Sequence, residues 1–264
     1  MDESLSTTTR TTRARSGTGI VVKTIRGIGW ASLVVGLLIL GFVAQQLFVT
    51  SWFADRNQVQ LEEQAQEYFD ATAAGVEEVP YITPLPGQQS RTGSGGSVPA
   101  ETPNSIDGGP RATILVEPAP PVHQAFAILR IPKLDKLRDG WTVVEGVERS
   151  DLRNGAGHMT HTPVPGQPGN SVISGHRTTY GAPFHDFDKL EPGDVIEVET
   201  AIGMHTFVVR EIVIVKPTEL WVTAPRDGAW LTLTTCHPKF SSRQRLVVFA
   251  ELVDGPNAAA ILGA

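Results

Sequence analysis

The chain has 264 residues, of which 41% are hydrophobic and 19% are charged, and its formal net charge at pH 7 is −6. This length allows one or two domains with packed cores, and the acidic balance argues against nucleic acid as a partner, because no basic stripe follows the first 26 residues. The single cysteine excludes an intramolecular disulfide, so burial of apolar side chains must stabilise the fold.

Residues 28–49 form the first structural signal in the chain. They carry no charged side chain, and a helix of this length spans about 33 Å, enough for a hydrocarbon core of about 30 Å. Trp30 and Trp52 lie near its two ends, where interfacial aromatic residues are common. A cleaved signal peptide is the alternative, but the apolar run is long for one and no clear Ala-x-Ala site follows. We therefore predict an uncleaved transmembrane helix at residues 28–50.

Charges flank this helix unequally. Residues 1–26 contain five basic and two acidic residues, in a composition rich in Ser, Thr and Gly that is typical of disordered tails. Acidic residues follow the helix, from Asp55 to Asp70. Because Lys and Arg are enriched on the cytoplasmic side, we predict a single-pass cell-membrane protein with a cytoplasmic tail at residues 1–27 and an extracellular remainder.

Two segments of different composition come next. Apolar residues from Leu61 to Ala73 recur at helical spacing among Gln and Glu, which predicts a helical stalk over residues 51–75; a merely solvated acidic face is the alternative. Residues 76–121 are rich in Pro, Gly and Ser and show no hydrophobic period. This composition predicts a flexible linker.

Residues 122–254 have the pattern of a folded all-β domain. Turn signals such as Glu191-Pro-Gly-Asp194 separate short strand candidates. The predicted strands are Ala125–Ile131, Trp141–Gly146, Asn170–Gly175, Asp194–Thr200, Met204–Val215, Trp230–Thr235 and Arg245–Leu252. One short helix is expected around Ala182–Leu190. We predict a β-barrel or sandwich, followed by a loose tail at residues 255–264.

Cys236 lies at the end of a predicted strand. Leu231, Leu233 and three threonines favour the strand, and Pro238 ends it because proline cannot donate to a sheet ladder. The end of a rigid strand is a suitable place for a nucleophile. A lone cysteine is commonly a small buried hydrophobic residue, but a leftover thiol in an exported protein is also a candidate reactive group.

Candidate partners for the thiol lie on two other strands. His176 follows the predicted strand that ends at Gly175, again at a strand end. Arg245 comes nine residues after Cys236, and a hairpin loop over residues 239–244 would place the two side by side. A fixed guanidinium there can bind a carbonyl or an oxyanion. Arg243 competes for this role, and a structural histidine and a surface arginine are the alternatives.

These residues lie in segments that resemble the sortase family. Thr232–Cys236 matches the family's TLxTC motif, Ser174–Arg177 resembles its histidine segment, and Arg245–Val248 resembles the strand that brings its arginine. Residues 165–170 and 181–194 also look like sortase stretches. The resemblance covers roughly residues 124–252 in family order, and the Cys-His-Pro sequence after the motif is similar to class E, the housekeeping-like branch of Gram-positive bacteria.

The resemblance implies a fold and an activity. The fold would be an all-β, sortase-type closed barrel of about eight strands with one or two short helices. The activity would be that of a membrane-anchored cysteine transpeptidase, which cleaves an LPXTG or, in class E, an LAXTG sorting signal between Thr and Gly. Its partners would be secreted proteins that carry this signal and an amine of a cell-wall precursor. No cofactor is expected.

The resemblance also implies roles for particular side chains. Cys236 would attack the threonine carbonyl, His176 would protonate the leaving amine, and Arg245 would hold the substrate and the oxyanion. Substrate-binding residues are expected among their motif neighbours, namely Thr234, Thr235 and Arg177.

The sequence does not favour a pilin-type lid, a metal site or catalytic roles for further histidines. Residues 76–121 contain no Asp-Pro-aromatic lid motif of the kind found in pilin-type sortases, so polymerisation of pilins is not favoured. Three scattered acids, Asp186, Asp188 and Glu191, are typical of a solvated surface, and we predict no metal. His158 and His161 are expected to be structural, and His237 is adjacent to the nucleophile without an assigned role.

Two other functions compete with a sortase. A cell-wall L,D-transpeptidase also uses Cys and His on a β-rich fold, but it places the cysteine in a His-Gly-x-x-Cys-like context that Leu-Thr-Thr-Cys does not fit. A non-catalytic, membrane-anchored β-module that binds wall material or a partner protein would keep Cys236 buried and unreactive.

Overall fold

The computed structural model of the chain describes residues 18–45, 50–81 and 112–263. The chain divides into two compact units, Met1–Gln46 and Leu47–Ala264. The predicted cytoplasmic tail lies mostly outside the described residues, as do the middle of the expected linker and the side chain of Trp52.

The first unit contains one long apolar helix, α1 (Thr18–Ala44). Its stretch Val22–Ala44 is long and apolar enough to cross a membrane, and side chains such as Leu38 and Phe42 are exposed within the unit. The predicted apolar helix is therefore present, although it begins about ten residues earlier than predicted. Its length and composition are those of a membrane span.

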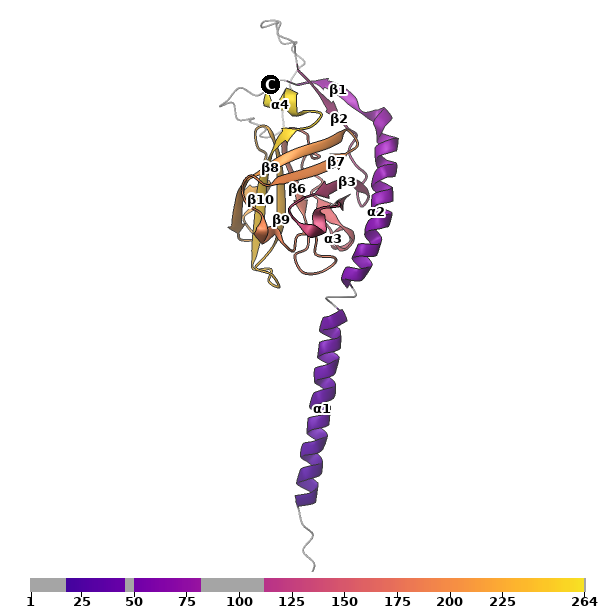
Figure 1. Cartoon of the computed structure of the whole chain (residues 1–264), viewed down its shortest axis with the longest axis vertical. Helices are drawn as coiled ribbons and strands as arrows, with labels where there is room; N and C mark the ends of the chain where they lie inside the picture. Colours follow the sequence, from indigo (N-terminus) through magenta and orange to yellow (C-terminus); the bar gives the residue numbers. More distant parts are fainter. Residues whose placement is uncertain (1–17, 46–49, 82–111, 264) are drawn as a thin grey trace, which may run out of the picture. The chain divides into compact units, whose positions relative to one another are not determined.

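The second unit contains a closed β-barrel (Figure 1). Its strands are β3 (Ala125–Arg130), β4 (Trp141–Glu145), β5 (Ala156–His158), β6 (Gly169–Ser174), β7 (Val195–Thr200), β8 (Gly203–Val215), β9 (Ala229–His237) and β10 (Gln244–Asp254). The order around the barrel is β10-β8-β7-β3-β4-β5-β6-β9. Neighbours are antiparallel except for the pairs β4–β5 and β6–β9, which are parallel. The predicted closed barrel of about eight strands is confirmed.

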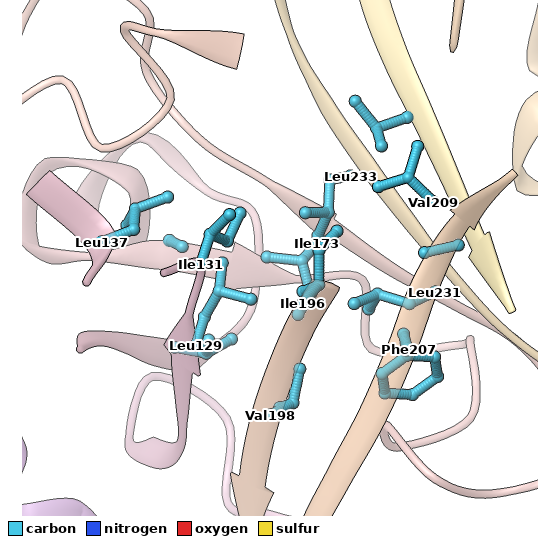
Figure 2. Packing of buried hydrophobic residues seen from close by; sticks show 14 of the residues in the cluster. Leu129, Ile131, Leu137, Ile173, Ile196, Val198, Phe207, Val209, Leu231 and Leu233 are labelled. Atoms are coloured by element: carbon cyan, nitrogen blue, oxygen red, sulfur yellow. The ribbon is translucent and has the colours of Figure 1, made fainter. Parts of the chain in front are cut away.

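Apolar residues of the strands fill the barrel interior (Figure 2). On β7, buried Ile196 and Val198 alternate with more exposed residues, the pattern of a strand with one face in a core. On β6, the residues from Asn170 to Ile173 are buried on both faces, a common pattern for a parallel strand in the interior of a sheet. On its parallel partner β9, one face is buried and Thr232 is the buried residue of the other face.

The seven predicted strands match β3, β4 and β6–β10 to within two residues at each end. Prediction missed β5, because Ala156-Gly157-His158 is short and lacks strand-forming residues. It also missed α3 (Arg149–Asn154), whose start is capped by reciprocal bonds between Glu148 and Asp151 rather than by the usual Ser or Thr signal. The helix expected around Ala182–Leu190 is only a 3₁₀ turn, η4 (Phe187–Lys189). The other 3₁₀ turns among the described residues are η2 (Ala73–Gly75), η3 (Asp135–Leu137) and η5 (Leu220–Thr223).

Helix α2 (Thr50–Thr72) packs along the barrel beside β3 (Figure 1). Ala65 is fully buried against Ala125 and Ile128. The Gln58 amide donates to the Asn154 carbonyl at 2.8 Å and accepts from the Thr142 N–H at 2.9 Å. The segment expected as a stalk is thus a helix that covers one face of the barrel.

Two short strands border the segment expected as a linker. β1 (Glu77–Pro80) pairs antiparallel with β2 (Thr113–Val116), and Ile114 of β2 is buried in the main core. The C-terminal residues also differ from the expected loose tail: they form α4 (Ala258–Leu262), with Ala258 and Ile261 buried. Asn257 ties both regions together, because its side chain bonds the N–H and C=O of Leu115 at 2.8 and 2.9 Å.

These contacts predict that α2 and β2 stabilise the folded barrel. A chain of residues 122–264 lacks α2 and β2, which leaves Ile128 uncovered and removes Ile114 from the core. Burial of one such side chain stabilises by about 1.5–3 kcal/mol. We expect residues 50–264 to melt several degrees higher than residues 122–264 in calorimetry, and equal melting temperatures would contradict this packing.

Glu117 predicts a pH dependence of stability. The side chain is 5% exposed; Oε2 accepts from the Ala201 N–H at 3.1 Å, and Oε1 has no partner among the described residues. Burial raises the pKa of Glu117 from 4.5 to about 7. The folded state therefore binds more protons than the unfolded state between these values, and Glu117 makes folding less favourable as pH rises through that range.

We expect Glu117→Gln to be more stable than the parent protein at pH 8, by up to about 3 kcal/mol, with little difference at pH 4.5. Buried His205, whose pKa burial lowers to about 4, makes an opposite contribution to both proteins, so the difference between them isolates Glu117. Urea unfolding at several pH values measures this, and a difference that does not change with pH would exclude the ionisation of Glu117 as its cause.

Candidate active site

Cys236 and Arg245 face each other across two neighbouring strands. β9 and β10 are antiparallel and joined by the short loop after Pro238, and their register pairs Cys236 directly with Arg245. β9 ends at His237, before the proline. The hairpin predicted from the nine-residue spacing is therefore confirmed.

His176 reaches the same end of the barrel through the parallel pair β6–β9. Ser174 is in register with Thr234, so both chains leave the sheet at the same edge. Beyond that pair, the Gly175 N–H donates to the Thr234 carbonyl at 3.1 Å, and the Thr235 hydroxyl donates to the Gly175 carbonyl at 2.7 Å. These bonds hold the two segments that carry His176 and Cys236 side by side.

A cavity of about 400 Å³ brings these residues together. Its polar wall contains the two threonines of the motif and all three predicted catalytic residues, namely Thr234, Thr235, His176, Cys236 and Arg245. Its apolar wall comes from other segments and contains Val147, Leu152, Met159, Leu220 and Val222. A peptide with apolar side chains could bind beside a thiol, an imidazole and a guanidinium.

One part of the apolar wall, η5, is held by a buried asparagine that sequence reasoning did not select. The Asn170 amide donates to the carbonyls of Val222 and Ala224 at 3.1 and 3.0 Å, and its oxygen accepts from the Thr232 hydroxyl at 2.6 Å. The sequence signal for this role was the position of Asn170 at the start of an otherwise apolar strand. A buried amide there is expected to hydrogen-bond a neighbouring segment.

His176 is half-buried at the cavity wall. Its ring contacts that of Tyr180, with centroids 5.1 Å apart, and the Arg153 guanidinium lies 5.6 Å from the Tyr180 ring. Burial and, secondly, the positive charge of Arg153 lower the pKa of His176. The imidazole is thereby kept neutral at neutral pH, in the form that accepts a proton from a thiol or an amine.

Arg245 is oriented by the loop before it. Its Nη1 donates to the carbonyls of Ser242 and Gln244, each at 3.0 Å, and its side chain lines the cavity. Arg243, the competing candidate, is exposed and does not line this cavity. The geometry therefore favours Arg245 as the cationic group beside the thiol.

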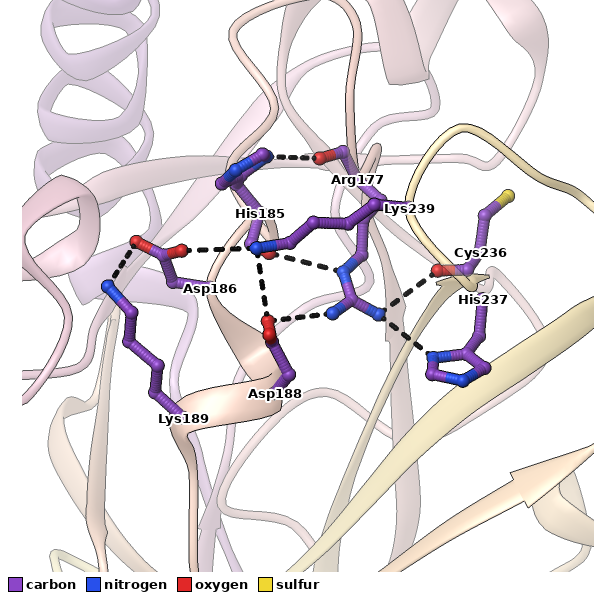
Figure 3. A network of polar contacts seen from close by, with 8 residues as sticks. All are labelled: Arg177, His185, Asp186, Asp188, Lys189, Cys236, His237 and Lys239. Atoms are coloured by element: carbon purple, nitrogen blue, oxygen red, sulfur yellow. Dashed lines mark hydrogen bonds and ion pairs between the residues drawn. The ribbon is translucent and has the colours of Figure 1, made fainter.

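Arg177, expected to bind substrate, lies elsewhere. Its side chain is 2% exposed and is bonded to the side chain of Asp188 and to groups of His185, Cys236 and His237 (Figure 3). It does not line the cavity. Its guanidinium is committed to internal contacts, so the geometry does not support a substrate contact, and the motif gave no sign of this burial.

The remaining histidines and acids have structural partners or open surroundings. His158 is buried between the Glu145 carboxylate at 2.6 Å and the Thr162 hydroxyl at 3.1 Å, whereas His161 is exposed. The three acids predicted to form a solvated surface make ion pairs with Lys and Arg side chains, at Asp186, Asp188 and Glu191. Over residues 18–45, 50–81 and 112–263, no group of three His, Cys, Asp or Glu side chains is placed to hold a metal ion.

The contact between Arg153, Tyr180 and His176 predicts a measurable change in titration. Removal of the positive charge in Arg153→Gln should raise the pKa of His176 toward its ordinary value, because a nearby cation disfavours the imidazolium. NMR titration of the His176 ring proton measures this. Arg138→Gln, which removes an exposed arginine paired with Asp135, is the matched control and should leave the His176 titration unchanged.

Comparison with known proteins shows which families and structures this chain is similar to. Residues 129–253 match the family model described as "Sortase domain". Sortase SrtE1 of Streptomyces coelicolor is 30% identical over 261 residues, a match covering 93% of this chain and 61% of that protein. SrtE2 of the same organism is 28% identical, covering 89% and 84%. The structure of sortase E from Streptomyces avermitilis aligns with a TM-score of 0.47 at 36% identity, covering 53% of this chain and 95% of that one.

Proposed function

The chain belongs to the sortase family, with class E-like relatives, and on this basis we propose that it is a membrane-anchored cysteine transpeptidase. It cleaves an LAXTG- or LPXTG-type sorting signal between Thr and Gly and transfers the acyl group to an amine of a cell-wall precursor. One observation carries the proposal: β6, β9 and β10 bring His176, Cys236 and Arg245 to a single cavity.

In the first half of the reaction, the Cys236 thiolate attacks the carbonyl carbon of the signal's threonine. The resulting tetrahedral oxyanion is stabilised by the guanidinium of Arg245, which faces the cysteine across the strand pair. The carbon–nitrogen bond then breaks, and protonated His176 donates its proton to the departing glycine amine. The product is a thioester between the threonine and Cys236.

In the second half, the incoming amine attacks the thioester carbonyl. Neutral His176 accepts the proton that the amine loses, the carbon–sulfur bond breaks, and Cys236 leaves as a thiolate. The imidazolium and thiolate that start the cycle are thereby restored. The neutral form that burial and Arg153 favour at His176 suits this proton-accepting step.

The same balance of charges limits the rate. Free cysteine and histidine side chains have pKa values near 8.5 and 6.5, so a thiolate paired with an imidazolium accounts for about 1% of such a pair at neutral pH. A lowered pKa of His176 reduces the imidazolium fraction further. We therefore expect slow turnover, with a rate that depends on the binding of the sorting signal to complete the site.

The apolar helix α1 supports the anchoring part of the proposal. Arg10, Arg13 and Arg15 precede its span Val22–Ala44, and Lys23 and Arg26 lie at the start of that span. This placement of basic residues favours a cytoplasmic N-terminus. The barrel would then lie outside the cell, where secreted proteins with sorting signals and the amine of the wall precursor are found.

The test uses residues 50–264 with LAXTG and LPXTG peptides and a glycine-based amine. Mass spectrometry should detect a thioester on Cys236 and a Thr–amine product, both lost in Cys236→Ala. Arg245→Ala should slow acylation about 10²–10³-fold, the usual cost of removing one oxyanion donor. The matched control is Arg243→Ala, which should acylate at nearly the parental rate.

If no adduct forms, the rate at which iodoacetamide alkylates Cys236 distinguishes two explanations. Fast alkylation of Cys236 by iodoacetamide would mean that the nucleophile is competent and the peptides are wrong. Slow alkylation in a folded protein would contradict the transpeptidase and favour a non-catalytic binding module.

A further inference from the structure

Arg177 directly follows His176 and reaches across to the strand that carries Cys236 (Figure 3). Its Nη1 lies 3.3 Å from the Cys236 carbonyl oxygen and 3.3 Å from His237 Nδ1. Because an arginine can only donate, both of these groups accept. The residue next to one predicted catalytic group thus holds the backbone of the other.

The same guanidinium also fixes the loop that follows His176. Its Nε donates to the His185 carbonyl at 3.1 Å, and His185 Nδ1 donates in return to the Arg177 carbonyl at 2.9 Å. This reciprocal pair closes the loop that contains Tyr180, whose ring contacts His176. Arg177 therefore restrains His176 from both sides, through its own backbone and through this loop.

The charge of Arg177 is compensated locally. Its Nη2 donates to Asp188 at 2.7 Å, and the same carboxylate is 3.3 Å from the ammonium of Lys239, in the loop after β9. A buried guanidinium is costly unless it is paired and hydrogen-bonded. Here the pairing meets that cost and ties the loops after β6 and β9 to one another.

This arrangement distinguishes Arg177 from a substrate-binding residue. In Figure 3 the Cys236 carbonyl faces the guanidinium, whereas its sulfur points away from it. The side chain is 2% exposed and does not line the cavity. Its contacts can act on the reaction only by fixing where the sulfur and the imidazole lie.

We propose that Arg177 is a positioning residue that sets the alignment of Cys236 with His176; the proposal rests on the transpeptidase activity proposed above. Catalysis depends steeply on such alignment, since a misplacement of about 1 Å can cost about 10²-fold in rate. The carboxylate of Asp188 supports this role by orienting the guanidinium.

Kinetics of acylation with the preferred peptide test the proposal. Arg177→Ala should lower kcat about 10²-fold while KM stays within about threefold, because the side chain does not contact the cavity. Arg177→Lys keeps the charge but cannot reach all the acceptors, so it should fold and lose roughly tenfold in kcat. Arg210→Ala, which removes an arginine paired only with Glu251 in the described structure, is the matched control and should retain parental kinetics.

Three results would overturn the proposal. The first is a raised KM with unchanged kcat, which would make Arg177 a substrate contact. The second is a loss of kcat no larger than the unfolded fraction measured by thermal melting, which would make its role purely structural. The third is unchanged kinetics in both variants.

A readout without peptide separates this proposal from the proposed function. In the parent protein, His237 Nδ1 accepts from Arg177 and the ring proton is on Nε2, a tautomer visible in ¹⁵N NMR spectra. Arg177→Ala should change the Nδ1 signal, and an unchanged signal would overturn the contact. If neither peptide acylates Cys236 in the parent protein, the proposed function fails. The NMR spectrum would still decide whether Arg177 holds the end of β9.

Discussion

The parallel pairing of β6 with β9 is the constraint on which the rest of the site depends. Parallel strands that end together place the residues that follow them at the same edge of a sheet. The register of β6 with β9 therefore brings the residues after Ser174 and Thr234 side by side. The antiparallel neighbour β10 then adds Arg245 opposite Cys236. Cys236 and Arg245 thereby stand at strand ends and His176 lies two residues beyond one, and a barrel with no free edge holds those strands in register.

Buried polar groups reinforce this pairing at several depths. Asn170 and Thr232 form a buried hydrogen bond between β6 and β9, and the Asn170 amide also bonds the η5 wall. Nearer the cavity, the Thr235 hydroxyl donates to the Gly175 carbonyl. Beyond it, the Arg177 guanidinium donates to the Cys236 carbonyl from outside the cavity. Each satisfied polar contact admits one geometry only, so the series specifies the alignment of the two strands more sharply than apolar packing alone could.

The sequence was sufficient to predict what local patterns encode. Alternating apolar residues and turn signals located seven strands. The spacing from Cys236 to Arg245 predicted that the two strands carrying these residues form a hairpin. The sequence did not reveal the docking of α2, because an apolar stripe such as Leu61, Ala65 and Phe69 looks the same in a sequence whether it faces solvent or a barrel. The burial of Arg177 was also missed, because it depends on Asp188 and on the carbonyl of Cys236, which come from other segments and leave no mark on the arginine's own segment.

The pairing of β1 with β2 joins the two segments that flank residues 82–111, since Pro80 and Thr113 are partners in one ladder. A proteolytic nick between β1 and β2 would leave two fragments, one with α1, α2 and β1 and the other with β2 and the barrel. The first would stay bound through α2 on β3 and β1 on β2. Release of the barrel from an anchor at α1 would thus require cleavage ahead of α2, because cleavage between β1 and β2 would leave both fragments bound to each other.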